Sequence, residues 1–498
     1  MPSPRWTDFI NQLPTEILIN VFRKSLDPAR PGKDLSHLRG VCNLWRSIVE
    51  STPSLWSHIS AEDGIQHVRD AITKTGEVPL DLACLWDDET TNITVEDFLT
   101  AVMEKSEYWR SVEITVPERP LAYPGLQSMP CPALETLKLW CIDPLPPSTA
   151  PFTLFGGMPA PSALKALTLC EVPVRLESLE PLELEALTLF NPGLQSMEEI
   201  VRILKTSPRL VTLVLEDVVD LQPPITSETP LIQLQQLDTL RLRLPVCSTE
   251  FLLSTLHAEK LDRLIVRPQY SSFLPSMLFA PNITHWVPVL RRMVQKAART
   301  EIGFEWSNTC FLKFGKLDYR LTMEFVDRTQ CVREILDWHL ANLGEAVATL
   351  PARLSYHNVS QDFGDIELFS ILPEVTELSI IEHSMAELVP VCEALRRPTQ
   401  SKPPQWLLPN LYILHCDLAK ESYTSLLAML RGRYGSRGSR EPSLDQLPPP
   451  PSLREIRFFK GTVRTLPPPK DDGFLRELQL LSKGAQIYWM GELQAFHD

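Results

Sequence analysis

The residues of this 498-residue chain that could support catalysis or hold a metal do not form a recognisable active-site pattern. His415 precedes Cys416, but neighbours on a strand point to opposite faces, so the pair is poorly placed to chelate one ion. Adjacent carboxylates at 87–89 and 471–472 are typical of solvated loops. No Gly-rich phosphate loop, G-x-S-x-G or H-E-x-x-H motif is present. We therefore predict a protein that is not an enzyme and has no metal or cofactor, with a hydrolase as a remote alternative.

A second group of residues has side chains suited to binding another protein. Four arginines lie on two consecutive leucine-rich segments, and arginine makes bidentate contacts with carboxylate or phosphate. They are Arg241, Arg243, Arg263 and Arg267. We predict that they bind an acidic or phosphorylated segment of a partner, with apolar anchors at Trp140, Phe190 and Phe459. The alternative is simple solvation, or internal pairing with Glu216, Glu259 or Asp262.

The positions of these arginine and aromatic side chains depend on a strand pattern that recurs along the sequence. The phrase Leu-x-x-Leu-x-Leu, with some apolar replacements, returns at intervals of about 20 to 30 residues in its early copies. Its last two apolar positions lie two residues apart, so on a strand both face one side, which we predict to be a solenoid core. The copies begin at Leu134, Leu164, Leu184, Leu210, Leu237, Leu261, Val375, Leu411, Leu453 and Leu475.

The segments between many copies have the spacing of amphipathic helices. We expect helices within 196–207, 248–258, 287–300, 330–345 and 384–398. Residues 78–86 and 109–117 are predicted to form the first two strands, with a helix between them, whereas 283–370 has no assignable repeat. Alternation of strand and helix predicts an α/β fold with a parallel sheet.

This pattern resembles an irregular leucine-rich-repeat horseshoe, with a parallel concave sheet and helical return segments. An ordinary α/β domain with leucine-rich strands is the alternative. Regular repeats carry Asn or Cys three places after the final leucine, which forms a ladder that satisfies backbone groups of the turns. This chain has other residues there: Ile142, Val172, Pro192, Val218, Pro245 and Gln269.

Two apolar helical patterns stand near the N-terminus, within residues 13–56. The first begins at Pro14, where a helix tolerates proline, and we expect Asp34 to cap a second, single helix. A unit of this size buries too little apolar surface to be stable alone. Its apolar face is therefore predicted to dock on another protein, or else to cap the first repeat of the solenoid.

These N-terminal residues resemble the F-box. Leu13 and Pro14, with Ile17, Leu18 and Phe22, are similar to its first helix, and the later "VC…W…IV" pattern and Trp56 also match. The resemblance implies binding to a Skp-type adaptor within a cullin–RING ubiquitin ligase. The residues it assigns to the adaptor-docking surface are Leu13, Pro14, Ile17, Leu18, Val41, Cys42 and Trp45.

Composition narrows the classes of partner. The net charge of −14 disfavours general binding to nucleic acid or to an anionic membrane. The scattered cysteines and the absence of a secretory signal indicate a cytoplasmic or nuclear protein. We predict a helical module at 8–58 and a solenoid at 59–498, with a flexible loop at 431–452.

Together these features predict a substrate-recognition subunit of a Skp–cullin–F-box ubiquitin ligase. In this interpretation the helical module docks on the adaptor and the solenoid holds a client protein. The alternative is a leucine-rich-repeat scaffold or sensor unrelated to ubiquitin.

Overall fold

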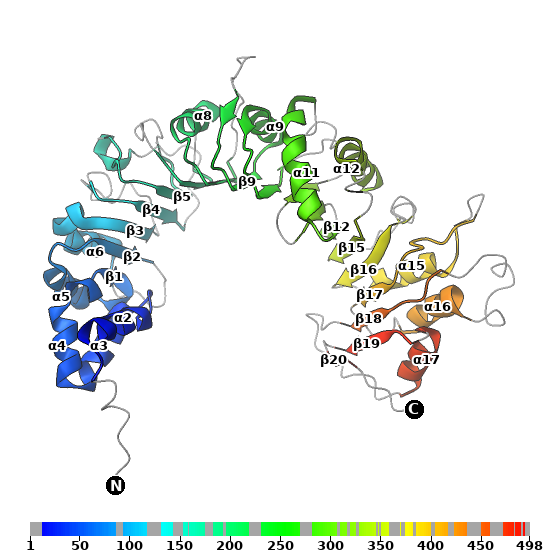
Figure 1. Ribbon diagram of the computed structural model, residues 1–498, viewed down its shortest axis with the longest axis horizontal. Helices are drawn as coiled ribbons and strands as arrows, with labels where there is room; N and C mark the ends of the chain where they lie inside the picture. Colours follow the sequence, from blue (N-terminus) through cyan, green and yellow to red (C-terminus); the bar gives the residue numbers. More distant parts are fainter. Residues whose placement is uncertain are drawn as a thin grey trace, which may run out of the picture. The chain divides into compact units, whose positions relative to one another are not determined.

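Short helices open the chain, and strands alternating with helices follow them, as a computed structural model shows (Figure 1). The chain divides into a first unit, Met1–Leu244 with Thr255–Leu261, and a second unit, Pro245–Ser254 with Asp262–Asp498. The structure describes residues 12–85, 93–116, 131–142, 153–157, 159–174, 183–192, 196–218, 231–268, 281–305, 309–315, 319–324, 328–344, 347, 350–357, 369, 374–381, 385–399, 404–416, 423–435, 450–458, 472–482, 484–489 and 492–493.

The described part of the N-terminal module, from residue 12 onward, contains three helices: α2 (Thr15–Ser25), α3 (Pro31–Val41) and α4 (Asn43–Ser51). The prediction that a helix is capped by Asp34 was wrong, because α3 already begins at Pro31, whose fixed φ suits a first helical position. Asp34 instead accepts a hydrogen bond from the backbone N–H of Asp27 at 2.7 Å. The expected single helix breaks at Cys42, whose backbone is extended and whose Sγ caps α4.

In the first unit, successive long strands pair in parallel from β1 to β7 and then with β9. These strands are β1 (His58–Ser60), β2 (Leu80–Cys84), β3 (Trp109–Val116), β4 (Thr136–Cys141), β5 (Ala166–Cys170), β6 (Ala186–Phe190), β7 (Thr212–Glu216) and β9 (Thr239–Arg243). β8 (Ile232–Gln233) and β10 (Leu256–His257) form a separate parallel pair. The helices are α5 (Ile65–Thr75), α6 (Val95–Val102) and α8 (Met197–Thr206), with 3-10 turns η1 (Pro53–Leu55), η2 (Ala61–Asp63), η3 (Met103–Tyr108) and η5 (Leu154–Gly157).

A polar ladder joins the turns that follow β5, β6 and β7. Glu171, Asn191 and Asp217 each have positive φ, a conformation that few residues other than glycine adopt. The backbone N–H of each donates to the last carbonyl of the next strand, at 2.8 to 2.9 Å. The Asn191 side chain also donates to Glu171, and Asp217 pairs with Arg243 at 3.0 Å. This ladder lies one residue earlier than the Asn position of regular repeats.

In the second unit an antiparallel segment, β12–β13–β14, interrupts the parallel order. From β12 the sheet continues in parallel through β15 to β19, and β20 closes it antiparallel. The strands are β11 (Arg263–Val266), β12 (Thr300–Glu305), β13 (Thr309–Phe314), β14 (Tyr319–Glu324), β15 (Ala352–His357), β16 (Val375–Ile381), β17 (Ile413–Cys416), β18 (Glu455–Phe458), β19 (Gln486–Trp489) and β20 (Glu492–Leu493).

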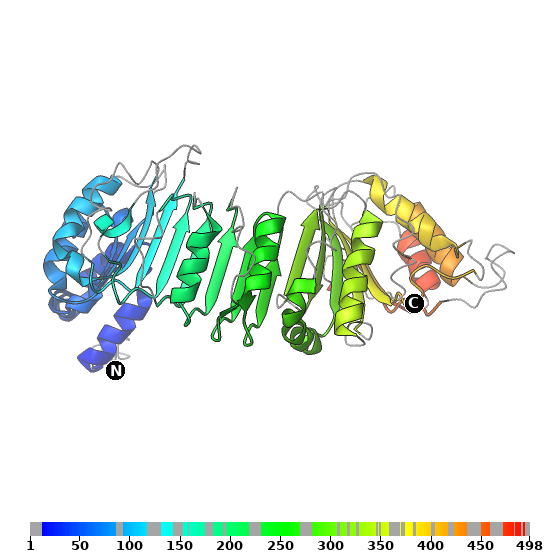
Figure 2. The same cartoon turned by 90° about the horizontal axis from the view of Figure 1, so that it is seen from above.

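Helices cover one face of each unit's sheet, and the opposite face is called the open face below (Figures 1 and 2). From α9 onward the helical elements are α9 (Val246–Thr255), η7 (Pro281–Trp286), α11 (Val287–Lys296), α12 (Arg328–Leu343), α15 (Met385–Arg396), α16 (Tyr423–Tyr434) and α17 (Asp472–Ser482). The predicted return helices are therefore confirmed, and so is the solenoid-like α/β architecture.

Several sequence predictions about individual segments were wrong. The copy at Leu475 is not a strand but part of α17, where Leu478 is buried and Leu480 is 79% exposed. A strand, β1, precedes the two that we predicted to be first. Residues 431–434 belong to α16 and not to a flexible loop, because Arg433 is fully buried there. The central part of that predicted loop, 436–449, lies outside the described residues.

Candidate protein-binding site

The interior of the N-terminal module is built from one apolar face of each helix. Helix α2 contacts α4, and Leu18 and Phe22 on α2 and Ile48 and Val49 on α4 are all at most 4% exposed. The Phe22 ring lies 4.7 Å from that of Trp45, centroid to centroid. These contacts fix the helices relative to one another, so the remaining apolar side chains have defined positions on the surface.

Other apolar side chains of the same module stay open to solvent. Leu13, Ile17 and Val21 follow one another at four-residue intervals, so they form a stripe along one side of α2 and the residues before it. They are 41%, 46% and 50% exposed. Val41 and Leu44, at the break between α3 and α4, are 54% and 42% exposed. We call these five side chains the apolar stripe. Singly exposed apolar side chains are ordinary, but this concentration within one small module is typical of an interaction site.

The seven residues predicted to contact the adaptor divide into three groups by exposure. Leu13, Pro14, Ile17 and Val41 are exposed. Cys42 and Trp45 are half-buried, and Leu18 is only 1% exposed, so it belongs to the module's own interior. Sequence reasoning left out Val21 and Leu44. Val21 could have been found from its position one helical turn after Ile17, whereas Leu44 depends on the break at Cys42.

Hydrogen bonds connect the N-terminal module to the residues that follow β1. Their acceptor is the carboxylate of Asp63, at the end of η2, and their donors lie at the start of α3. Asp63 Oδ2 and Oδ1 accept hydrogen bonds from the backbone N–H groups of Gly32 and Lys33, at 2.8 and 3.1 Å. Burial raises the pKa of Asp63 and lowers the pKa of its neighbour His67. A Cβ on Gly32 would lie 2.4 Å from His67 Nε2, so this close approach requires glycine. Arg30 adds an ion pair with Glu62 at 2.7 Å.

The open face of the first unit carries two of the three aromatic residues predicted as anchors, Trp140 and Phe190. Strand register places Trp140, Cys170, Phe190, Glu216 and Arg243 in one row across β4, β5, β6, β7 and β9. Trp140 is 40% exposed and Phe190 is half-buried. The row therefore changes from apolar to charged along the sheet.

Two of the four predicted arginines have acidic partners. Arg241 pairs with Glu216, as the alternative interpretation allowed, and Arg243 pairs with Asp217 at 3.0 Å. Both belong to the first unit, whereas Arg263 and Arg267 belong to the second unit and are exposed. The other suggested partners pair elsewhere, Glu259 with His257 at 3.6 Å and Asp262 with Lys296 at 2.8 Å. Phe459 lies outside the described residues.

The residues considered for catalysis or metal binding do not come together. His415 and Cys416 are 5% and 0% exposed, and His415 Nε2 lies 3.5 Å from a carboxylate oxygen of Glu377. Among the described residues no group of three His, Cys, Asp or Glu side chains is placed to hold a metal ion. Residues 87–89 and Asp471 lie outside the described part of the chain, and Asp472 begins α17.

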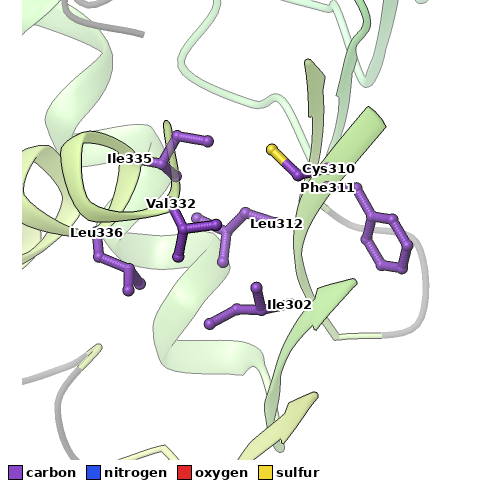
Figure 3. Close-up of a pocket in the computed structure, with 7 residues that line it drawn as sticks. All are labelled: Ile302, Cys310, Phe311, Leu312, Val332, Ile335 and Leu336. Carbon is purple, nitrogen blue, oxygen red and sulfur yellow. The ribbon is translucent and has the colours of Figure 1, made fainter. Parts of the chain in front are cut away.

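A small cavity in the second unit is apolar throughout. It lies between α12 and the strands β12 and β13, and Figure 3 shows Ile302, Leu312, Val332 and Ile335 directed toward it. Such a lining offers no polar group to orient a substrate. In the described part of the chain, no helix has the length and apolar character needed to cross a bilayer.

A helical module with an exposed apolar stripe thus precedes a strand–helix solenoid, a combination typical of proteins that bind other proteins. Comparison with protein families agrees: residues 10–62 match the family model described as F-box-like. The matched segment contains the whole apolar stripe and Asp63 follows it directly. A search of curated proteins found no match.

Proposed function

We propose that this protein is the substrate-recognition subunit of a Skp–cullin–F-box-type ubiquitin ligase. Its F-box-like helices dock on a Skp-type adaptor, and its solenoid binds a client protein. The observation that carries the proposal is the apolar stripe of Leu13, Ile17, Val21, Val41 and Leu44, because it lies within the F-box-like residues and stays exposed. The protein itself then performs no covalent chemistry and needs no cofactor, since the ligase supplies the catalytic components.

A binding experiment with purified proteins tests this proposal. Covering two half-exposed aliphatic side chains contributes about 2 kcal/mol, so Ile17→Ala with Val41→Ala should weaken adaptor binding roughly thirtyfold. Isothermal titration with a Skp-type adaptor measures the change. Leu480→Ala is the matched control, because Leu480 is a 79% exposed leucine on α17, far along the chain. If the intact chain does not bind the adaptor, or the double variant binds it equally well, the proposal fails.

The client-binding part of the proposal concerns the open face. Trp140 and Phe190 supply apolar contact area, and Phe459 is retained from the sequence as a third anchor. Arg241, Arg243, Arg263 and Arg267 are proposed to bind acidic or phosphorylated groups of the client. Because Arg241 and Arg243 already have acidic partners, a client group must compete with Glu216 and Asp217 for them. Cytoplasm or nucleus is the proposed location, in keeping with the nine described cysteines, none of which forms a disulfide.

One observation favours the alternative of a scaffold unrelated to ubiquitin. The hydrogen bonds from Gly32 and Lys33 to Asp63 join the module to the first strands, as expected of a cap on a solenoid. A cap has no need of an exposed apolar stripe, however, and the adaptor titration separates the two functions.

A further inference from the structure

The open face of the second unit carries a row of alternating charges. Strand register aligns Lys313 on β13, Glu301 on β12, Arg353 on β15 and Glu377 on β16. Lys313 Nζ lies 3.2 Å from Glu301, and Arg353 Nε lies 3.7 Å from Glu301 and 3.3 Å from Glu377. Arg299, just before β12, reaches the same Glu377 at 3.2 Å. Each carboxylate of this row is thus shared between two or more cations.

The carboxylates are the most deeply buried groups of this row, and of the cations Arg353 is 16% and Lys313 21% exposed. The side chains of Glu301 and Glu377 are each 11% exposed, whereas that of Arg299 is 46% exposed. Burial opposes ionisation of Glu301, but Lys313 and Arg353 outweigh it and lower the pKa of the carboxyl. On β18, Arg457 is 43% exposed over Glu455, which is 16% exposed. The charged groups most exposed to solvent here are therefore the guanidinium groups of Arg299 and Arg457, although the whole chain has a net charge of −14.

A second row, beside the first, holds buried polar groups under these cations. Register aligns Ser355, Ser379, His415 and Arg457 across β15 to β18. The Arg353 guanidinium donates to Ser379 Oγ at 3.1 Å. Burial, and then the positive charges of Arg353, Arg457 and Arg299, lower the pKa of His415 to about 4, so the imidazole is neutral at physiological pH. Across the two rows, four cations pair with only three carboxylates, Glu301, Glu377 and Glu455, and this excess of positive charge favours an incoming anion.

We propose that this face binds an extended, acidic segment of a protein, whose carboxylate or phosphate groups contact Arg299 and Arg457 above His415. We call these residues the second-unit anion site. The inference rests on the proposed function, since it adds a client-binding site that none of the arginines named above forms. A protein segment fits better than nucleic acid, because the negative charge of the whole chain repels a long polyanion.

Strand spacing sets the pattern of charge that the segment should carry. Arg299 pairs with Glu377 on β16 and Arg457 pairs with Glu455 on β18, so their guanidinium groups lie over strands two apart. Two strand spacings measure ~10 Å, which an extended chain spans in about three residues. The expected ligand therefore carries acidic groups roughly three residues apart.

Fluorescence anisotropy with labelled peptides and the full chain tests the second-unit anion site. The probes carry glutamate, phosphoserine or lysine at about every third position of a Gly/Ser background. We expect both acidic probes to bind and the lysine probe not to bind. R299Q with R457Q should weaken binding at least about tenfold, because two charge-assisted contacts are lost. R299K with R457K should retain part of the affinity.

Controls separate this proposal from its alternatives. Arg110→Gln, which breaks a comparable strand ion pair with Asp81 in the first unit, should leave probe binding unchanged. The denaturation midpoint of each variant shows whether it folds. Equal binding by R299Q/R457Q, or tighter binding of a DNA oligonucleotide than of either acidic probe, overturns the proposal. Adaptor titration of the same preparations distinguishes failure of this site from failure of the proposed function. A preference for the glutamate or the phosphoserine probe identifies the anionic group that the site binds.

Discussion

Arg433 anchors the C-terminal part of the second unit, and Arg433→Met should destabilise it. The side chain is fully buried on α16, and its Nη1 donates to the carbonyl of Leu407 at 2.7 Å. Its Nη2 donates to the carbonyl of Leu408, a residue with positive φ. Leaving a buried acceptor unsatisfied costs about 1–3 kcal/mol, so two lost contacts cost about 2–6 kcal/mol. Methionine also removes the desolvation penalty of a buried charge, which leaves an expected loss of about 3 kcal/mol.

Hydrogen exchange measured by mass spectrometry, together with urea denaturation, can test this prediction. Exchange should rise in the segment before β17 and in α16, because Arg433 joins them through Leu407 and Leu408. Arg431→Met is the matched control: Arg431 lies on the same helix but is 49% exposed, and its ion pair with Glu477 should contribute less than about 1 kcal/mol. Equal stability and equal exchange in the two variants would refute the anchoring role.

Three further predictions concern stability. His339 is fully buried with a pKa lowered by burial to about 4, so as pH falls from 6.5 toward 4 the unfolded state gains a proton that the folded state does not. Unfolding free energy should decrease by up to about 3 kcal/mol over this range, and His339→Phe should show a shallower dependence in denaturation series at several pH values. Gly32→Ala should loosen the N-terminal module, because its Cβ would meet His67 and Asp63, and limited proteolysis should cut the module faster. Leu18→Ala should lower stability by about 2–5 kcal/mol and Ile17→Ala by much less, as thermal denaturation can show.

The strands could be predicted from the sequence wherever the leucine pattern within a few residues defines them. Each early Leu-x-x-Leu-x-Leu copy places two leucines on one face of a strand, and Leu137 and Leu139 are at most 1% exposed on β4. The copy at Leu475 misled because the same apolar spacing also suits a helix, in which Phe474 and Leu478 share the buried face of α17.

The antiparallel segment of the second unit was not predictable from periodicity. β13, with the sequence TCFLKF, is buried at five of its six positions, so apolar and polar residues do not alternate along it. Its register is set by β12 and β14, which are themselves distant from the leucine pattern. Arg433 shows the same limit. Its neighbours in sequence are glycine, arginine and tyrosine, and nothing in that local sequence indicates that the carbonyls of Leu395 and Leu407, on other segments, accept its hydrogen bonds.

The candidate docking surface could be predicted as a region but not residue by residue. Ile17 and Leu18 are adjacent aliphatic residues of one helix, yet one is 46% exposed and the other 1%. The difference comes from how α2 packs on α4, and that depends on the break at Cys42. No helix-breaking residue occupies position 42, so the boundary arises from packing and from the cap that Cys42 Sγ gives to Trp45 N–H.

Attachment of the N-terminal module to the first strands has a consequence for client presentation. Asp63 holds the start of α3, and Trp56 Nε1 donates to the Val49 carbonyl at 2.8 Å while its ring stacks on His67 of α5. The module and the parallel strands β1 to β9 also belong to one compact unit. An adaptor bound at the apolar stripe would therefore be held in a fixed geometry relative to the open face that carries Trp140. A rigid connection raises effective concentration more than a flexible linker of the same reach. The positions of the lysines on a bound client, and not client affinity alone, should therefore decide which lysines are modified.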